Sequence, residues 1–292
     1  IYIHIILRSV SIISKKSPIT VSSWTLGDQC TFEERVSAAK EAGFEGIGLR
    51  AETYVDALAE CLHDEDILAI LKKYDMKVTE VEYITMWAED HRSYEQKYKE
   101  QICFHMCDLF GVQHINIGLM EKYSVEHTAQ KLKELCQRAG KYIIGVEPMP
   151  YSGIPDVKTG WAVVKGCGCD NAKLILDSWH WIRANQSYDP SYLADIPADK
   201  IISIQINDVQ QHPYAPTILR DESMHDRMVP GTGYGDTAGF VKMIRDKGIE
   251  PKVCGVEVIS DVIIAKGVKE AAKENFEGTK KVLEQVWPEI LG

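Results

Sequence analysis

The sequence predicts a single (β/α)8 barrel over residues 18–292, with residues 1–17 as an N-terminal arm or edge strand. Eight short apolar, β-branched segments alternate with segments of helical periodicity along the 292-residue chain. Successive strand-like segments begin about thirty residues apart, which is the length of one βα unit. No glycine-rich dinucleotide fingerprint follows the first of them, and this argues against the alternative of an open, doubly wound sheet.

The strands are expected where short apolar runs are bounded by turn residues. In chain order these runs occupy residues 19–24, 45–49, 77–84, 113–117, 142–147, 172–177, 201–206 and 252–258.

The first helix is expected at 31–43, where Thr31 is the N-cap, Glu34 completes a capping box and Gly43 ends the helix. Further helices are predicted at 64–75, 94–110, 124–140, 235–248 and 267–287. The glycine-rich segment 231–235 has no strand directly before it, so it is interpreted as a loop. It closes the longest irregular stretch, 207–234, and long βα loops of a barrel usually cover the active site.

Composition limits the classes of partner. The chain has 33 basic and 43 acidic residues, a net charge of −10, which argues against a nucleic-acid partner and says little about small neutral substrates. Its eight cysteines follow no four-ligand zinc pattern, so we expect reduced thiols in a cytoplasmic protein. The apolar N-terminal run carries His4 and Arg8 and is shorter than the roughly 20 residues of a membrane span. We expect no membrane association, and the apolar arm favours an oligomer.

Four polar residues end the last four predicted strands. They are Glu147, Asp177, Gln205 and Glu257. Carboxylates rarely lie against a core unless they are paired or bind a metal. The carboxyl ends of parallel strands meet at one mouth of a barrel, and oxygen ligands suit a hard divalent cation. The sequence therefore predicts a metal site there, although any single one of these residues can also serve as an ordinary strand cap.

Two further residues have the chemistry of catalytic groups. His180 follows Asp177 by three residues, on the loop that we expect after the sixth strand, and is a candidate acid/base group. Its alternative is packing between Trp179 and Trp181. Arg227, in the long loop, is a candidate to grip a carboxylate, phosphate or enolate oxygen, with a surface ion pair to Glu222 as its alternative.

Other residues after the strands are candidates for a substrate-binding wall. They are Trp24, Glu82, Trp87 and Met149. Aromatic and methionine side chains at a barrel mouth suit the apolar faces of sugars or rings. The same side chains would also serve as the top layer of the barrel core, and the residues alone leave both interpretations open.

The chain resembles the xylose isomerase-like TIM-barrel superfamily, often labelled sugar phosphate isomerase/epimerase. The matching segments are SSWTLG, AAKEAGFEGIGLR, KVTEVEYITMW, GVEPMPYSGIPD, LILDSWHWIR, QIND, RMVPGTGYGD and GVEVIS, in order over residues 20–260. The resemblance implies one divalent ion, often manganese, with Glu147, Asp177 and Glu257 as ligands and His180 as the D-x-x-H histidine. Gln205 stands where many members have a histidine ligand, as in a branch that resembles dehydroshikimate dehydratases. Met149 stands where those dehydratases have a histidine.

The chemistry implied by this resemblance is proton abstraction next to a carbonyl. The metal, manganese with magnesium or cobalt as alternatives, polarises the carbonyl, and Glu147, Glu257 or His180 takes the proton. The expected activity is isomerisation or epimerisation of a sugar or keto-sugar. The alternative is a lyase in the same fold, either a dehydratase or one half of a C-glycoside deglycosidase that contains a second small protein chain. Acidic charge and missing further ligands argue against an abasic-site endonuclease, and a non-enzymatic binding protein is the remaining alternative.

Overall fold

The computed structural model describes residues 17–292. The predicted arm, residues 1–17, lies outside the described residues except for Ser17. The buried Ser17 hydroxyl donates a hydrogen bond to the Pro251 carbonyl at 2.6 Å, which ties the start of the described chain to the segment before β8.

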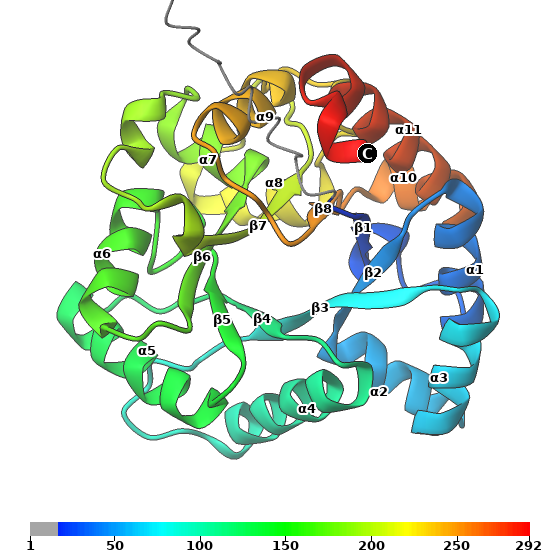
Figure 1. Ribbon diagram of the computed structural model, residues 1–292, viewed down its shortest axis with the longest axis horizontal. Helices are drawn as coiled ribbons and strands as arrows, with labels where there is room; N and C mark the ends of the chain where they lie inside the picture. The colour runs from blue at the N-terminus through cyan, green and yellow to red at the C-terminus, as the bar shows by residue number, and fades with distance from the viewer. Residues whose placement is uncertain (1–16) are drawn as a thin grey trace, which may run out of the picture.

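Eight parallel strands form a closed barrel in chain order, and β1 pairs with both β2 and β8. Figure 1 shows the strands as a ring with the helices around its outside. The predicted fold class is therefore confirmed. The strands are β1 Ile19–Ser22, β2 Gly46–Arg50, β3 Lys77–Ile84, β4 His114–Ile117, β5 Ile143–Val146, β6 Ala172–Asp177, β7 Ile201–Ile206 and β8 Cys254–Val256.

The six predicted helices are present, with further helices that the sequence pattern had not indicated. The α-helices are α1 Phe32–Ala42, α2 Ala51–Ala59, α3 Asp64–Lys73, α4 Tyr94–Phe110, α5 Val125–Ala139, α6 Val157–Cys167, α7 Ser178–Asn185, α8 Leu219–His225, α9 Thr237–Asp246, α10 Asp261–Ile264 and α11 Val268–Val286. The predicted caps of α1 are confirmed, because Thr31 accepts from the Glu34 amide in a full capping box and Gly43 adopts φ 112°. No helix within residues 17–292 is both long and apolar enough to cross a membrane.

The long segment between β7 and α9 is an ordered strap over the barrel mouth. Its start is fixed by the Asp208 carboxylate, which accepts backbone N–H groups from Val209, Gly231, Gly233 and Gly235 at 2.8–3.1 Å. Isolated antiparallel bridges join Asp208 to Met228 and Asp226 to Ser260. Arg227 lies between Asp226 and Met228, the two bridged residues, so the backbone that carries its side chain is held on both sides.

Candidate active site

The four strand-end residues meet at the carboxyl end of the barrel. Glu147 directly follows β5, Asp177 ends β6, Gln205 lies in β7 and Glu257 directly follows β8. All four side chains are buried. The strand register places Gln205 beside Asp177 on one neighbour and beside Gly255 on the other. The residues that the sequence singled out therefore lie on adjacent strands, at the carboxyl end of the barrel.

The functional atoms of these residues are close together. One donor atom each from Glu147, Asp177 and His180 lies within 4.8 Å of the others. Glu257 joins the group through Arg227, whose Nη1 lies 3.0 Å from Asp177 Oδ2 and 3.1 Å from Glu257 Oε2. The strap thus places a guanidinium among the carboxylates at the strand ends. Arg227 is buried, so the alternative interpretation of a surface ion pair is wrong.

His180 lies in a helix and not on a loop, which corrects the sequence-based placement. Helix α7 begins directly after β6 because the Asp177 carboxylate caps it, accepting the His180 backbone N–H at 2.8 Å. The His180 Nε2 atom then lies 3.4 Å from Glu147 Oε1 and 3.3 Å from Arg227 Nη2. The ring also packs edge-on against Trp179, with centroids 5.2 Å apart. His180 therefore both packs against an aromatic side chain and faces the carboxylates.

Burial controls the protonation of the site. It lowers the pKa of His180 to about 3, an effect that the nearby Asp177 opposes and Arg227 reinforces. Burial raises the pKa of Glu147, Asp177 and Glu257 above their usual values, although Arg227 opposes the rise. The arrangement favours a neutral imidazole beside carboxyl groups that gain from a cationic partner.

Unpartnered atoms test whether a cation suits this group. Glu147 Oε1, Gln205 Oε1 and His180 Nδ1 are buried, and none has a hydrogen-bond partner among residues 17–292. Buried polar atoms without partners are rare and costly. The two free oxygens, beside further carboxylate oxygens, form a donor set that fits a divalent cation. His180 Nδ1 carries the proton of the neutral ring, because Nε2 faces the Arg227 guanidinium.

A cavity of about 110 Å³ opens above these residues. It is lined by Trp24, Arg50, Tyr83, Thr85, Gly118, Met120, Glu147, Met149, Tyr151, His180, Arg220, Met224, Arg227, Glu257 and Ile259. The Arg50 guanidinium lies 3.6 Å from the Trp24 ring centroid, a cation–π contact that fixes both side chains. Trp24, Met149 and Arg227 thus border the space above the carboxylates, and their contact with a substrate stays a prediction.

Two predicted wall residues do not line this cavity. The Trp87 side chain is 1% exposed and its indole N–H donates to the Gly118 carbonyl at 2.8 Å, so it packs within the barrel wall. Glu82 is also buried, accepting hydrogen bonds from Ser22 at 3.2 Å and from Asn116 at 2.9 Å. Both residues support the site from behind and do not border the cavity.

Sequence reasoning missed Tyr83, whose hydroxyl donates to Glu147 Oε2 at 2.7 Å. Strict alternation along β3 puts Glu82 and Tyr83 on opposite faces of the sheet. The register between β3 and β4 shifts between Glu82 and Ile84, and such a bulge turns one extra side chain toward the interior.

Asn207 was also missed, although its amide donates to Asp177 Oδ2 at 2.7 Å. Its position one residue after β7, two after Gln205, was the available signal.

Comparisons with known proteins agree with this architecture. The family model described as xylose isomerase-like TIM barrel matches residues 36–282. Two curated relatives are 3-dehydroshikimate dehydratases of Pseudomonas species. The Pseudomonas aeruginosa protein is 30% identical over 136 residues, 46% of this chain and 20% of the relative. The Pseudomonas putida protein is 29% identical over 157 residues, 53% of this chain and 24% of the relative. The aligned part therefore spans at most about a quarter of either relative's length.

Solved structures match over nearly the whole chain. The IOLI protein with a bound zinc atom has a TM-score of 0.80 at 17% identity, covering 92% of this chain and 99% of that protein. The D-allulose 3-epimerase from Methylomonas sp. has a TM-score of 0.68 at 12% identity, covering 94% and 98% of the two chains. At these identities the likeness is one of fold.

Proposed function

The chain belongs to the xylose isomerase-like TIM-barrel family, and from this membership we propose that it is a divalent-metal-dependent enzyme that removes a proton next to a carbonyl. Its substrate is a sugar or keto-sugar that it isomerises or epimerises. The observation that carries the proposal is the meeting of Glu147, Asp177 and His180 donor atoms within 4.8 Å, beside Glu257 and under an open cavity.

Glu147, Asp177, Gln205 and Glu257 would hold the cation. Their oxygen atoms favour manganese, with magnesium or cobalt as the alternatives, over metals that prefer nitrogen and sulfur. When bound, the cation would act as a Lewis acid on the carbonyl oxygen of the substrate and stabilise the charge that develops there.

The residues of the chain would handle the proton. Burial lowers the pKa of His180 to about 3, so the imidazole is neutral but is a weak base, and as an acid/base group it would pass the proton on rather than keep it. Glu147 and Glu257 are the other candidate bases, and Tyr83 orients Glu147 through its 2.7 Å hydrogen bond. Trp24 and Met149 would contact the apolar face of the substrate. Return of the proton to the neighbouring carbon isomerises, and return on the opposite face epimerises.

A lyase is the second candidate. The same removal of the α-proton leads to β-elimination when the neighbouring β-carbon carries a leaving group. A dehydratase, or a C-glycoside deglycosidase that contains a second small protein chain, would work in this way. Both curated relatives are named dehydratases of an acid. Arg50 and Arg220 line the cavity together with Arg227, and forked guanidinium groups suit a substrate carboxylate.

Solvent exchange tests the proposal. The manganese-loaded protein is incubated in D2O with D-allulose, an oxidised inositol and 3-dehydroshikimate, and the products are followed by NMR. Deuterium entering the carbon next to the carbonyl supports enolisation. One isomeric product identifies an isomerase or epimerase, whereas loss of water or release of an aglycone identifies a lyase. Binding of these ligands without any exchange would contradict the proposal and favour a binding protein.

His180→Ala is expected to lower turnover by about 100-fold, the usual contribution of a positioned acid/base group. Manganese content should stay near that of the parent protein, because three carboxylates and the Gln205 amide remain. Turnover and bound manganese are measured on the same samples. A loss of stability with unchanged turnover would return His180 to a packing role against Trp179.

The cellular compartment and the oligomeric state are also part of the proposal. All eight cysteines are free thiols, as expected of a protein in the reducing cytoplasm. We also propose that the chain forms an oligomer, which sedimentation of the purified protein would establish.

A further inference from the structure

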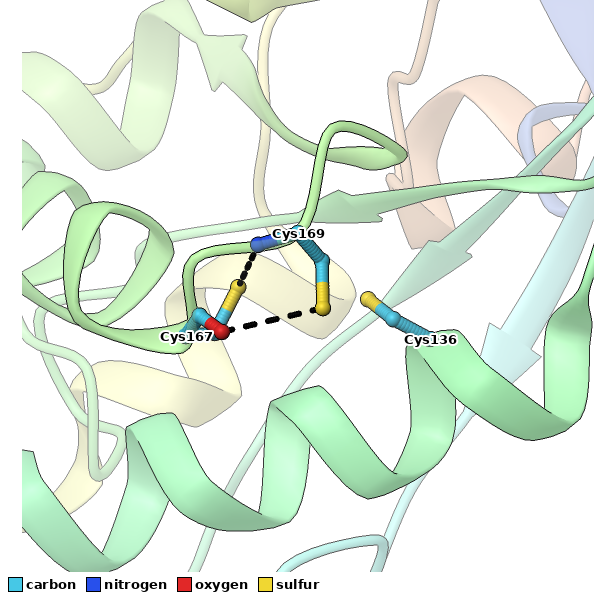
Figure 2. A group of neighbouring side chains, drawn as sticks. All are labelled: Cys136, Cys167 and Cys169. Carbon is cyan, nitrogen blue, oxygen red and sulfur yellow. Dashed lines mark hydrogen bonds between the residues drawn. The ribbon is translucent and has the colours of Figure 1, made fainter.

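Three cysteines lie together on the outer helical layer. Cys136 is in the last turn of α5, Cys167 is the last residue of α6, and Cys169 follows two residues later. Their sulfur atoms lie within 4.8 Å of one another. Figure 2 shows the Cys136 side chain reaching from its helix toward the loop that carries the other two. Thirty-one residues separate Cys136 from Cys167 along the chain, so the fold and not the sequence spacing creates this cluster.

The cluster is separate from the candidate active site. Cys169 lies three residues before the start of β6, whereas Asp177 is the last residue of that strand. Six extended residues span about 20 Å, so the thiols lie at the opposite end of the barrel from the carboxylates. A ligand at the thiols would therefore leave the barrel mouth free.

Local backbone geometry fixes the positions of the sulfur atoms. Gly168 adopts φ +66° at the end of α6, a left-handed conformation that turns Cys167 and Cys169 toward the same side. The Cys169 backbone N–H points at Cys167 Sγ at 3.4 Å. The Asn171 side chain donates to the Cys136 carbonyl at 3.1 Å and to the Tyr142 carbonyl at 3.0 Å, which ties the end of α5 to this loop. The three thiols are therefore held in place before any ligand arrives.

The surroundings favour a thiolate at Cys167. The pKa of Cys167 is lowered, chiefly by a hydrogen bond from the Cys136 thiol and further by the Cys169 amide and the charge of Lys200. The pKa of Cys169 is raised, chiefly by burial and by the neighbouring Cys167, and the pKa of Cys136 is raised, chiefly by its hydrogen bond to Cys167. One thiolate shared by three close sulfur atoms is therefore what the apo cluster favours. Cys136 and Cys167 are buried, whereas Cys169 is partly exposed and gives access from solvent.

We propose that Cys136, Cys167 and Cys169 bind one soft metal ion, Cu(I) or Zn(II), through three sulfur ligands. Thiolates select these ions, whereas the oxygen-rich barrel mouth selects hard ones. A metal–sulfur distance of about 2.3 Å places three sulfur atoms about 4 Å apart, close to the separation already present. Each thiol that coordinates the ion releases its proton to solvent, so binding yields up to three protons.

Cadmium binding tests the site, because coordination by thiolates gives an ultraviolet charge-transfer band that oxygen ligands do not give. The reduced protein, first saturated with Mn(II) to fill the barrel mouth, is titrated anaerobically with Cd(II). One equivalent per chain is expected to produce the band. In separate arms, Cu(I) should displace the cadmium, whereas Zn(II), which is less thiophilic than Cd(II), should compete only in excess, and the concentrations required give the relative affinities.

Variants locate the ligands. Cys167→Ser and Cys136→Ser should weaken Cd(II) binding by about 100-fold or more, since loss of a ligand costs at least as much as loss of an outer partner. Cys103→Ser, a buried thiol of α4, and Cys61→Ser, an exposed one, are matched controls that should bind like the parent. Circular dichroism verifies folding, and the partly exposed Cys169→Ser replaces any variant that fails to fold.

Three results would overturn the proposal. They are absence of the band in the parent protein, persistence of the band in the variants of the cluster, and an equal loss in the two controls. Formation of a Cys136–Cys167 disulfide in air, without retention of Zn(II) or Cu(I) by the reduced protein, would likewise make the cluster a redox pair and contradict metal binding.

Discussion

Replacing Glu257 with glutamine is expected to lower turnover on the order of 1000-fold, the upper range for loss of one preorganised electrostatic contact at a reacting centre. The change is isosteric and leaves the Glu257 backbone carbonyl, which accepts from Asn207 and Arg227, in place. It removes one negative charge from a buried site, so affinity for Mn(II) should fall as well. Glu147→Gln is expected to behave in the same way, because a glutamine oxygen can still accept the Tyr83 hydroxyl.

Elemental analysis after dialysis and single-turnover kinetics are the measurements. Glu250→Gln, an exposed carboxylate in a loop, removes the same charge from the whole protein and is the matched control. Full turnover by a folded, manganese-free Glu257→Gln protein would refute the metal-assisted mechanism.

Replacing Arg227 with methionine is expected to destabilise the protein by about 3–5 kcal/mol, because it leaves buried Asp177 and Glu257 carboxylates without their positive partner. Methionine preserves much of the volume, so the charge and its hydrogen bonds are what is lost. Burial raises the pKa of both carboxyls above their values in the unfolded chain. The folded variant therefore gains protons more readily than the unfolded one, and its deficit should shrink as the pH is lowered.

Manganese should restore much of this lost stability, because a cation at the carboxylates substitutes for the guanidinium. Thermal unfolding of parent and variant, with and without Mn(II), measures the effect through ligand linkage. Arg183→Met is the matched control, because Arg183 pairs with the buried Glu222 through its Nε at 2.8 Å, away from the four strand ends. An equal gain from Mn(II) in both variants would show that the ion does not bind at the carboxylates that Arg227 contacts.

The barrel could be predicted from the sequence because the signals for each strand and helix are local. Short β-branched runs, the capping box at Thr31 and the stop at Gly43 are all properties of neighbouring residues, and all three are present in the structure. The meeting of Glu147, Asp177, Gln205 and Glu257 then follows from barrel topology alone, since parallel strands end at one rim. Their roles as ligands and bases stay predictions.

The remaining features depend on irregularities and on packing between distant segments. Tyr83 reaches Glu147 only because the β3 register shifts, and no residue type marks that shift. His180 lies in the first turn of a helix because Asp177 both ends β6 and caps α7, and the sequence pattern had indicated only the end of the strand. The thiol cluster requires α5 and α6 to lie side by side, so the spacing of Cys136 from the other two carries no signal.

Asp208 and the bridges around Arg227 anchor the strap at its ends. Selection on the position of Arg227 can therefore act separately from selection on the exposed part of the strap. Residues 211–218, in the first half of the strap, are exposed, and among them Tyr214 alone bonds to an anchor residue, through its hydroxyl to Asp226 Oδ2 at 3.1 Å. Insertions or exchanges there would accordingly be tolerated, and they would reshape the rim near Arg220 while the guanidinium of Arg227 keeps its place. On the proposed function, new substrate preferences can therefore evolve, or be selected in a library, at this short stretch without disturbing the strand-end carboxylates.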